Sequence, residues 1–220
     1  MAHVPRVLVA RPWPDGAIPL DDARAHHLTR VLRLRPGSAI EYTDGAGIEG
    51  TGTLGEGAVV IRGPESPVAA PAPSLTIAVA PPHRAERARF VVEKLAELGV
   101  DRLCWLETRH GVDRPPPAGK TRRWAEAALE QSRGAWLMAV EGPVALADLD
   151  ARTLWVADPA GGAPPVAGDA LSVAVGPEGG WAPGEIPARA RLVAFGDRVL
   201  RTETAAVVAA TIALARSGRL

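Results

Sequence analysis

The sequence is poor in cysteine, with the single residue Cys104 among 220. One thiol cannot form an internal disulfide, and it excludes a zinc site built from several cysteines. We therefore expect a protein of the reducing cytoplasm. Cys104 stands beside Trp105 in an apolar run, so we expect it to be a small buried hydrophobic residue.

Long apolar runs are also missing. No stretch of 18 apolar residues is present that would suggest a membrane span. The only apolar run near the N-terminus, Val7–Ala10, is bounded by Arg6 and Arg11, with Pro12 and Pro14 close behind. This beginning lacks the pattern of a signal peptide. We expect no association with a membrane.

Phosphate-binding fingerprints are absent as well. No G-x-G-x-x-G follows a predicted strand, and no G-x-x-x-x-G-K-[ST] is present, which disfavours dinucleotide-binding domains, P-loop NTPases and general nucleotide-binding modules. The 25 basic and 25 acidic residues cancel, so a nucleic-acid binder would need a local basic patch. The histidines are too scattered to predict a metal site.

What is present indicates two domains. The length fits a medium domain plus a small one, and residues 1–62 look rich in β-strand. Strands are expected at Arg6–Val9, Ala39–Thr43 and Gly47–Leu54, where glycines within the last strand favour a strongly curved barrel. The Pro- and Ala-rich stretch Gly63–Ser74 is interpreted as a linker.

One helix is expected within this first region. Asp21 or Asp22 can cap it, and its apolar face would consist of four residues: Ala25, Leu28, Val31 and Leu32. Arginines and two histidines occupy much of the remaining surface. This surface is either a solvated helix face or an edge that contacts phosphates.

The remainder of the chain favours a parallel sheet. Leu75–Ala80 and Val100–Leu106 are apolar strands on either side of a helix that ends at Gly99, which is a βαβ arrangement. Further strands are expected at Thr153–Ala157, Leu171–Val175 and Leu192–Phe195. Further helices are expected at Lys120–Ser132, Gly184–Ala190 and Thr202–Ala215. The last helix is apolar nearly all round and should be buried.

Two loops carry the chemistry. The apolar strand Leu171–Val175 ends in Gly-Pro-Glu-Gly-Gly, where ligands bind in open α/β sheets. By itself this loop is either a tight turn or a ligand loop. The second loop lies in Arg198–Ala206, where Thr202 or Thr204 can cap the last helix and leave backbone N–H groups for a polar ligand. Together the two loops predict one shared pocket.

Four stretches carry a family resemblance: His26–Arg33, Val92–Val100, Val175–Gly180 and Val199–Ala206. Glu130–Arg133 is a further similar segment. In these stretches the sequence resembles the RsmE family of SPOUT-class methyltransferases, which methylate N3 of a uridine in 16S ribosomal RNA with S-adenosylmethionine. Relatives commonly have Phe or Leu where this chain has Trp181.

The resemblance implies an α/β fold with a SPOUT-type parallel-sheet domain and a C-terminal trefoil knot, preceded by a small PUA-like β-barrel. The barrel would be an RNA-binding domain over residues 1–68, and the methyltransferase domain would cover 69–220. The implied enzyme is a cytoplasmic homodimer of the 16S rRNA (uracil-N3)-methyltransferase type, acting on ribosomal RNA or the small ribosomal subunit. S-Adenosylmethionine would bind in the knot, at loops after Ala157, Val175 and Val199.

The resemblance and the two loops together give candidate site residues. The catalytic candidates are Arg201, as a cation for the developing uracil anion, and Glu203, which would accept a proton or hold Arg201. Arg201 could instead pair with Glu203 or Glu178 and only fix the loop. The candidates for the cofactor are Ala157, Val175, Gly176, Glu178, Gly179, Gly180, Val199, Leu200, Thr204 and Ala205.

RNA contacts are expected from arginines in both domains. The candidates are Arg30, Arg33, Arg84, Arg87 and Arg109. Residues 84–123 carry ten Lys and Arg against six Asp and Glu, an excess of four positive charges that suits a phosphate backbone. Two alternatives stay open, a SPOUT enzyme that acts on another RNA such as tRNA, and a non-catalytic RNA-binding homologue.

Overall fold

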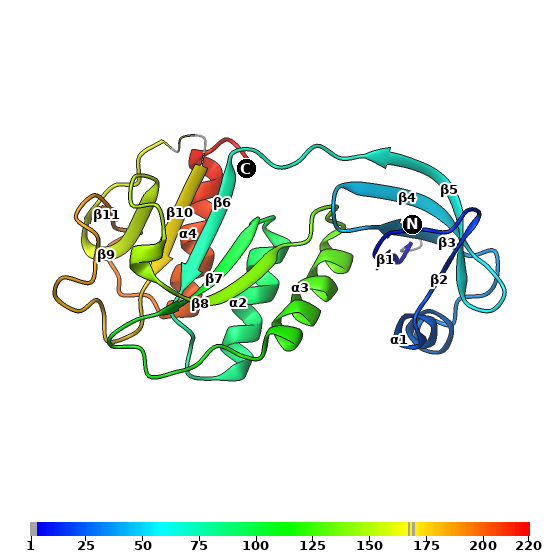
Figure 1. Cartoon of the computed structure of the whole chain (residues 1–220), viewed down its shortest axis with the longest axis horizontal. Coiled ribbons are helices and arrows are strands. Elements are labelled where there is room, and N and C mark those ends of the chain that lie inside the picture. Colours follow the sequence, from blue (N-terminus) through cyan, green and yellow to red (C-terminus); the bar gives the residue numbers. More distant parts are fainter. Residues whose placement is uncertain (1–3, 167, 169) are drawn as a thin grey trace. The chain divides into compact units, whose positions relative to one another are not determined.

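The computed structural model describes residues 4–166, 168 and 170–220. The chain divides into two compact units. The first contains the residues up to Ala70 together with Leu129–Leu137, and the second contains Pro71–Ala128 and Met138–Leu220. Each unit has its own β-sheet (Figure 1).

The first unit is built on a five-stranded sheet in the order β1-β3-β4-β5-β2. Its strands are β1 (Arg6–Leu8), β2 (Ala17–Pro19), β3 (Ala39–Thr43), β4 (Ile48–Leu54) and β5 (Val59–Pro67). Strands β2 to β5 pair antiparallel, whereas β1 runs parallel to β3. The expected strands at β1, β3 and β4 are confirmed, whereas β2 and β5 were not predicted. Because β5 continues to Pro67, the interpretation of Gly63–Ser74 as a linker is wrong for its first residues.

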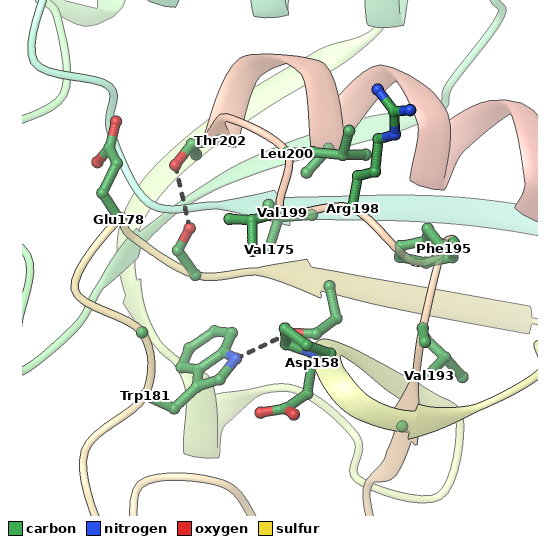
Figure 2. Close-up of a pocket in the computed structure, with 18 of the residues that line it drawn as sticks. Asp158, Val175, Glu178, Trp181, Val193, Phe195, Arg198, Val199, Leu200 and Thr202 are labelled. Carbon is green, nitrogen blue, oxygen red and sulfur yellow. Dashed lines mark hydrogen bonds between the residues drawn. The ribbon is translucent and has the colours of Figure 1, made fainter.

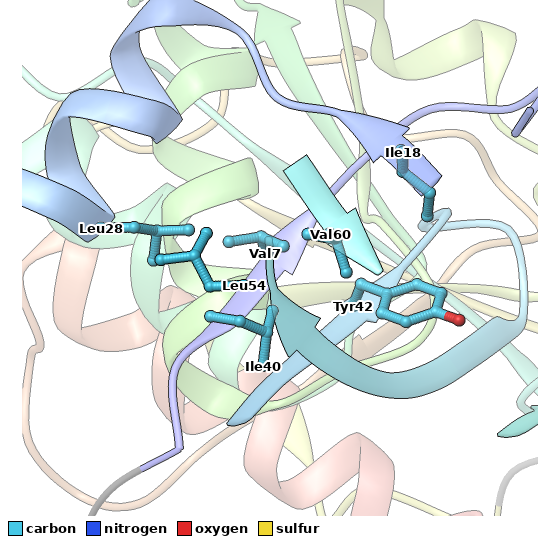
Figure 3. Packing of buried hydrophobic residues seen from close by; sticks show 7 residues of the cluster. All are labelled: Val7, Ile18, Leu28, Ile40, Tyr42, Leu54 and Val60. Carbon is cyan, nitrogen blue, oxygen red and sulfur yellow. The ribbon is translucent and has the colours of Figure 1, made fainter. Parts of the chain in front are cut away.

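Glycines shape this sheet as expected. The pairing of β4 with β5 shifts its register between Gly50 and Gly52, which is the irregularity that glycine inside a strand signals. A Cβ on Gly50 would stand 2.4 Å from the ring of Tyr42. The ring is fully buried among Val7, Ile18, Leu28, Ile40, Leu54 and Val60, the core of this unit (Figure 3).

The helical segment of the first unit begins as predicted and ends differently. The Asp21 carboxylate accepts a hydrogen bond of 2.7 Å from the Arg24 amide and caps α1 (Asp22–His26), which lowers the pKa of Asp21. The chain then continues in a wider turn, η1 (His27–Val31), where Leu32 N–H bonds to the His27 carbonyl. The wider turn keeps Leu28 buried but leaves Val31 57% and Leu32 42% exposed, so their expected place on the apolar face is wrong.

A segment from the middle of the sequence completes the first unit. The Leu8 amide donates to Glu130 Oε1 at 2.8 Å, and Arg133 pairs with Glu41. Backbone bonds join Gly47 N to Ala135 O (3.0 Å) and Leu137 N to Gly45 O (2.8 Å). The segment Glu130–Arg133 therefore stabilises the first unit through contacts with β1 and β3.

The second unit is built on a six-stranded sheet in the order β11-β9-β10-β6-β7-β8, and all its neighbouring strands pair parallel. The strands are β6 (Ser74–Val79), β7 (Arg102–Glu107), β8 (Ala139–Ala145), β9 (Leu154–Gly162), β10 (Ala170–Val175) and β11 (Arg191–Val193). The predicted parallel sheet is confirmed, although β8 was missed and β9 continues past Ala157.

Three long helices accompany this sheet: α2 (Ala85–Glu97), α3 (Ala118–Ser132) and α4 (Thr202–Arg216). Helices α2 and α4 pack against each other, and α4 also lies against β6 and β10. Gly99 follows α2 with a φ of +77°, which is the left-handed conformation expected after a helix. Of the helices in the described part of the chain, none has the length and apolar character that a membrane crossing requires.

Two predictions about local structure fail here, and one about burial is confirmed. Residues 184–190 form turns and not a helix, because Pro187 interrupts the segment and removes a donor. Arg201 and not a threonine is the N-cap of α4, with Thr202 as the first helical residue. Cys104 is only 2% exposed in β7, and burial raises the pKa of its thiol.

Candidate functional site

A cavity of about 420 Å³ opens beside the carboxyl end of β10 (Figure 2). Three segments line it, from β9, from the loop after β10, and from the stretch between β11 and α4. Its position follows from the parallel sheet, since the carboxyl ends of such strands leave a crevice for ligands. The shared pocket expected from the two loops is therefore present.

The glycine-rich loop after β10 is a tight turn. The Gly180 amide donates to the Pro177 carbonyl at 2.9 Å, and Gly180 has a φ of +70°, which favours glycine. On the outer side, His110 Nδ1 lies 3.1 Å from the carbonyl oxygen of Gly179 and 3.2 Å from that of Gly180. The loop is thus a fixed turn at the edge of the cavity.

Trp181 joins two of the lining segments. Its indole Nε1–H donates to the Ala157 carbonyl in β9 at 3.0 Å (Figure 2). Its ring lies against Gly176, where an added Cβ would stand 2.9 Å from Cε2 of the ring. Gly176 is therefore required for close approach of the indole, and Trp181 forms part of the cavity wall.

The first turn of α4 closes the cavity on another side. Thr202 Oγ1 donates to the Gly176 carbonyl at 3.2 Å, which ties α4 to the glycine loop (Figure 2). Glu203 in the same turn lies 3.4 Å from Arg87 Nε of α2. Arg201 is exposed, and within the described part of the chain its side chain makes no hydrogen bond or ion pair. Neither Glu203 nor Glu178 therefore pairs with Arg201.

The structure brings most of the predicted cofactor residues to this cavity. Those that line it are Ala157, Val175, Gly176, Glu178, Gly180, Val199, Leu200 and Ala205. Gly179 and Thr204 are not in its wall, and neither are the catalytic candidates Arg201 and Glu203, although all four neighbour residues that are.

Several lining residues were not among the individual residues predicted to bind the cofactor. These are Asp158, Pro159, Gly161, Pro177, Trp181, Val193–Arg198 and Thr202. Phe195 is one of only two phenylalanines, and Trp181 directly follows the glycine pair, so both gave a weak signal. The charged lining residues are three carboxylates, from Asp158, Glu178 and Asp197, and one guanidinium, from Arg198. The charged residues of the lining therefore sum to a net charge of −2.

The predicted RNA-contacting arginines have different surroundings. Arg30 and Arg33 are exposed in the first unit, and Arg84 is exposed at the N-cap of α2. Arg109 Nη1 donates to the Pro183 carbonyl at 3.2 Å, and its amide donates to Glu185. Among the residues that the structure describes, no group of three or more potential ligands could hold a metal ion.

Comparison with known proteins agrees with this geometry. Residues 70–214 match the model of an RNA methyltransferase domain, and residues 20–62 match that of an RNA methyltransferase PUA domain. These two matches, on a fold with a cavity at the carboxyl end of β10, define the class of the protein as an RNA methyltransferase with a PUA-type domain.

Curated relatives define the family. The ribosomal RNA small subunit methyltransferase E of Mycobacterium tuberculosis is 32% identical over 89% of this chain and 86% of its own length. The protein of the same name from Synechocystis is 29% identical over 94% of this chain and 74% of its own length. The chain belongs to the ribosomal RNA small subunit methyltransferase E family.

Solved structures share the whole fold. A probable rRNA methyltransferase from Porphyromonas gingivalis has a TM-score of 0.82 and 26% identity, covering 98% of this chain and 99% of that one. A ribosomal RNA small subunit methyltransferase E from Neisseria gonorrhoeae, solved with S-adenosyl methionine bound, has a TM-score of 0.84 and 24% identity. It covers 97% of this chain and 98% of that one, and it supports the fold.

Proposed function

We propose that this protein transfers a methyl group from S-adenosylmethionine to N3 of a specific uridine in 16S ribosomal RNA of the small ribosomal subunit. One observation carries the proposal. The Val175–Gly180 and Val199–Ala206 stretches, which first suggested the family, meet at one cavity in a chain of that family.

The cavity fits S-adenosylmethionine in size and charge. Its volume of about 420 Å³ lies in the range of small-molecule sites, roughly 300–1,000 Å³. The carboxylates of Asp158, Glu178 and Asp197 complement a positively charged ligand. Gly176 and Gly180 let the backbone approach it closely, and Leu200 and Ala205 offer an apolar surface.

The chemistry assigns distinct tasks to the chain's own residues. S-Adenosylmethionine, when bound, supplies an electrophilic methyl group. The loops must hold this group in line with the uracil N3, and such orientation is worth up to about 7–11 kcal/mol. Uracil N3 carries a proton and becomes a good nucleophile as that proton leaves. The guanidinium of Arg201, which has no hydrogen-bond or ion-pair partner among the described residues, would stabilise the negative charge that develops on the uracil.

RNA would be held by arginines of both units, of which Arg87 is half-buried and the other four are exposed. We propose Arg30 and Arg33 of the first unit, and Arg84, Arg87 and Arg109 of the second. Arg87 uses its Nε toward Glu203, but a guanidinium has further N–H groups that can reach a phosphate. Arg109 is tied to Pro183 by one amino group only.

We also propose that residues 1–68 and 69–220 are the two domains, with a C-terminal trefoil knot in the second. The two family-model matches support this division. We further propose that the protein acts in the cytoplasm, because ribosomal RNA lies there, and that it is a homodimer. Val199, which lines the cavity edge and is 90% exposed, is available to a second subunit.

Replacement of Arg201 tests the reaction. In a strain that lacks the gene, 16S ribosomal RNA should lack one methyl group by mass mapping, and the unaltered gene should restore it. Arg201→Ala should leave the methyl group absent although the protein remains folded and dimeric. Arg216→Ala, in the exposed last turn of the same helix, is the matched control and should restore methylation. Near-normal methylation by Arg201→Ala would contradict the role of Arg201.

A further inference from the structure

Glu203 is a carboxylate that the structure withdraws from solvent. Its side chain is 12% exposed, and its Oε2 atom exposes less than 1 Å² and has no hydrogen-bond partner within the described part of the chain. The other oxygen, Oε1, faces Arg87 Nε of α2 at 3.4 Å. A buried charge is costly unless another charge compensates it. Arg87 supplies that charge, together with the positive N-terminal end of α4.

This arrangement does not suit a proton acceptor. A general base must come within hydrogen-bond reach of the proton that it removes. One oxygen of Glu203 is inaccessible, and the other faces a guanidinium. The same arrangement suits an anchor, because it links the first turn of α4 to α2.

Arg201 depends on this anchor. It is the N-cap of α4, two residues before Glu203, and its exposed side chain makes no hydrogen bond or ion pair within the described chain. The first turn of α4 has two side-chain ties, from Thr202 to the Gly176 carbonyl and from Glu203 to Arg87. Loss of the second tie would let the turn tilt and move the Arg201 guanidinium.

We infer that Arg87 and Glu203 form a positioning pair that aims Arg201 at the substrate, and that Glu203 does not receive the uracil N3 proton. This inference rests on the proposed function. It adds a second role to Arg87, which is also proposed to contact RNA. Loss of the RNA contact alone would weaken RNA binding, whereas loss of the positioning role would slow the turnover of bound RNA.

Arg84 offers a matched control for Arg87. It lies three residues earlier, at the N-cap of α2, and is exposed. Within the described part of the chain it forms no ion pair, so its removal leaves no buried carboxylate alone. Arg84→Ala should raise KM for RNA, and it shows the effect that loss of a phosphate contact alone produces.

The experiment measures methyl transfer to small-subunit RNA at saturating S-adenosylmethionine for Arg87→Ala, Glu203→Gln, the double variant and Arg84→Ala. A displacement of 1 Å at a reacting group can cost about 100-fold in rate, so we expect kcat to fall at least about tenfold in each of the first two variants. The double variant should be no slower than the slower single variant, because both changes remove one interaction. Arg87→Lys, which keeps the charge, should recover part of kcat.

The pH profile separates an anchor from a proton acceptor. The acidic limb of kcat/KM should persist in Glu203→Gln, whereas loss of that limb would show that Glu203 accepts the proton and would overturn the inference. Glu203→Gln keeps the shape of the side chain, so it carries the test even where Arg87→Ala fails to fold. A wild-type kcat in either single variant, or losses that multiply in the double variant, would also overturn the inference. Inactivity of the unaltered protein would overturn the proposed function itself.

Discussion

Gly176 should tolerate no side chain, because the indole of Trp181 occupies the space. A Cβ at this position would lie 2.9 Å from Cε2, 3.1 Å from Cζ2 and 3.3 Å from Cδ2 of the ring. Carbon atoms at optimal separation are about 3.5–4.0 Å apart. Gly176 does not have a positive φ, so alanine would meet a steric conflict and no backbone strain.

The free-energy cost of a methyl group at Gly176 depends on how far the indole of Trp181 can move. Inserting a methyl group into a packed site typically costs about 1–3 kcal/mol. The indole cannot move away freely, because its N–H bond to the Ala157 carbonyl contributes about 0.5–1.5 kcal/mol. The added methyl group should destabilise the conformation of the cavity that binds S-adenosylmethionine by this amount. The affinity for S-adenosylmethionine should therefore fall about 5- to 150-fold in Gly176→Ala.

Isothermal titration calorimetry with S-adenosylmethionine provides the assay, and Trp181→Leu provides the matched background. Trp181→Leu alone removes the indole and its bond to Ala157, and should itself weaken binding. In that background Gly176→Ala should have little further effect, because the ring that it meets is gone. Equal affinity of Gly176→Ala and the unaltered protein would refute the steric reasoning, and so would an unchanged penalty in the Trp181→Leu background.

Three further predictions concern stability and RNA binding. Arg219 Nη1 donates to Asp101 Oδ2 at 2.6 Å and to the Pro73 carbonyl at 3.0 Å. Arg219→Ala should therefore lower the free energy of unfolding by about 2 kcal/mol and the melting temperature by about 4–8 °C, whereas Arg216→Ala should leave both unchanged. Burial raises the pKa of Tyr42 above its usual value near 10, so the folded form keeps this proton longer than the unfolded form and stability should decline as pH rises above about 10. Urea unfolding should show that decline in the unaltered protein and a smaller one in Tyr42→Phe. Arg84→Ala should reduce the slope of log affinity against log salt for 16S ribosomal RNA by about 0.7, and an unchanged slope would remove Arg84 from the phosphate contacts.

The sequence by itself determined those features that depend on neighbouring residues. Alternation and apolar runs predicted β3, β4, β6 and β10, and helical spacing predicted α2 and α3. The sequence offered Asp21 or Asp22 as the cap of the first helix, since such a side chain reaches an amide two or three residues away, and the structure has Asp21 in this role. The glycine loop after β10 could by itself be a tight turn or a ligand loop, and its pairing with the loop before α4 predicted the shared pocket that both loops line.

Only the tertiary structure decided which distant residues meet. Trp181 reaches Ala157, Arg87 reaches Glu203, and Leu129–Leu137 joins the first unit. Local pattern carries no information about these partners, because each contact depends on how separate elements pack. The same reason explains the exposure of Val31 and Leu32, since one wider turn changes the face on which later residues lie. Glu203 shows the difference most clearly, since its sequence position suggested chemistry and the structure buries it 3.4 Å from Arg87 of α2.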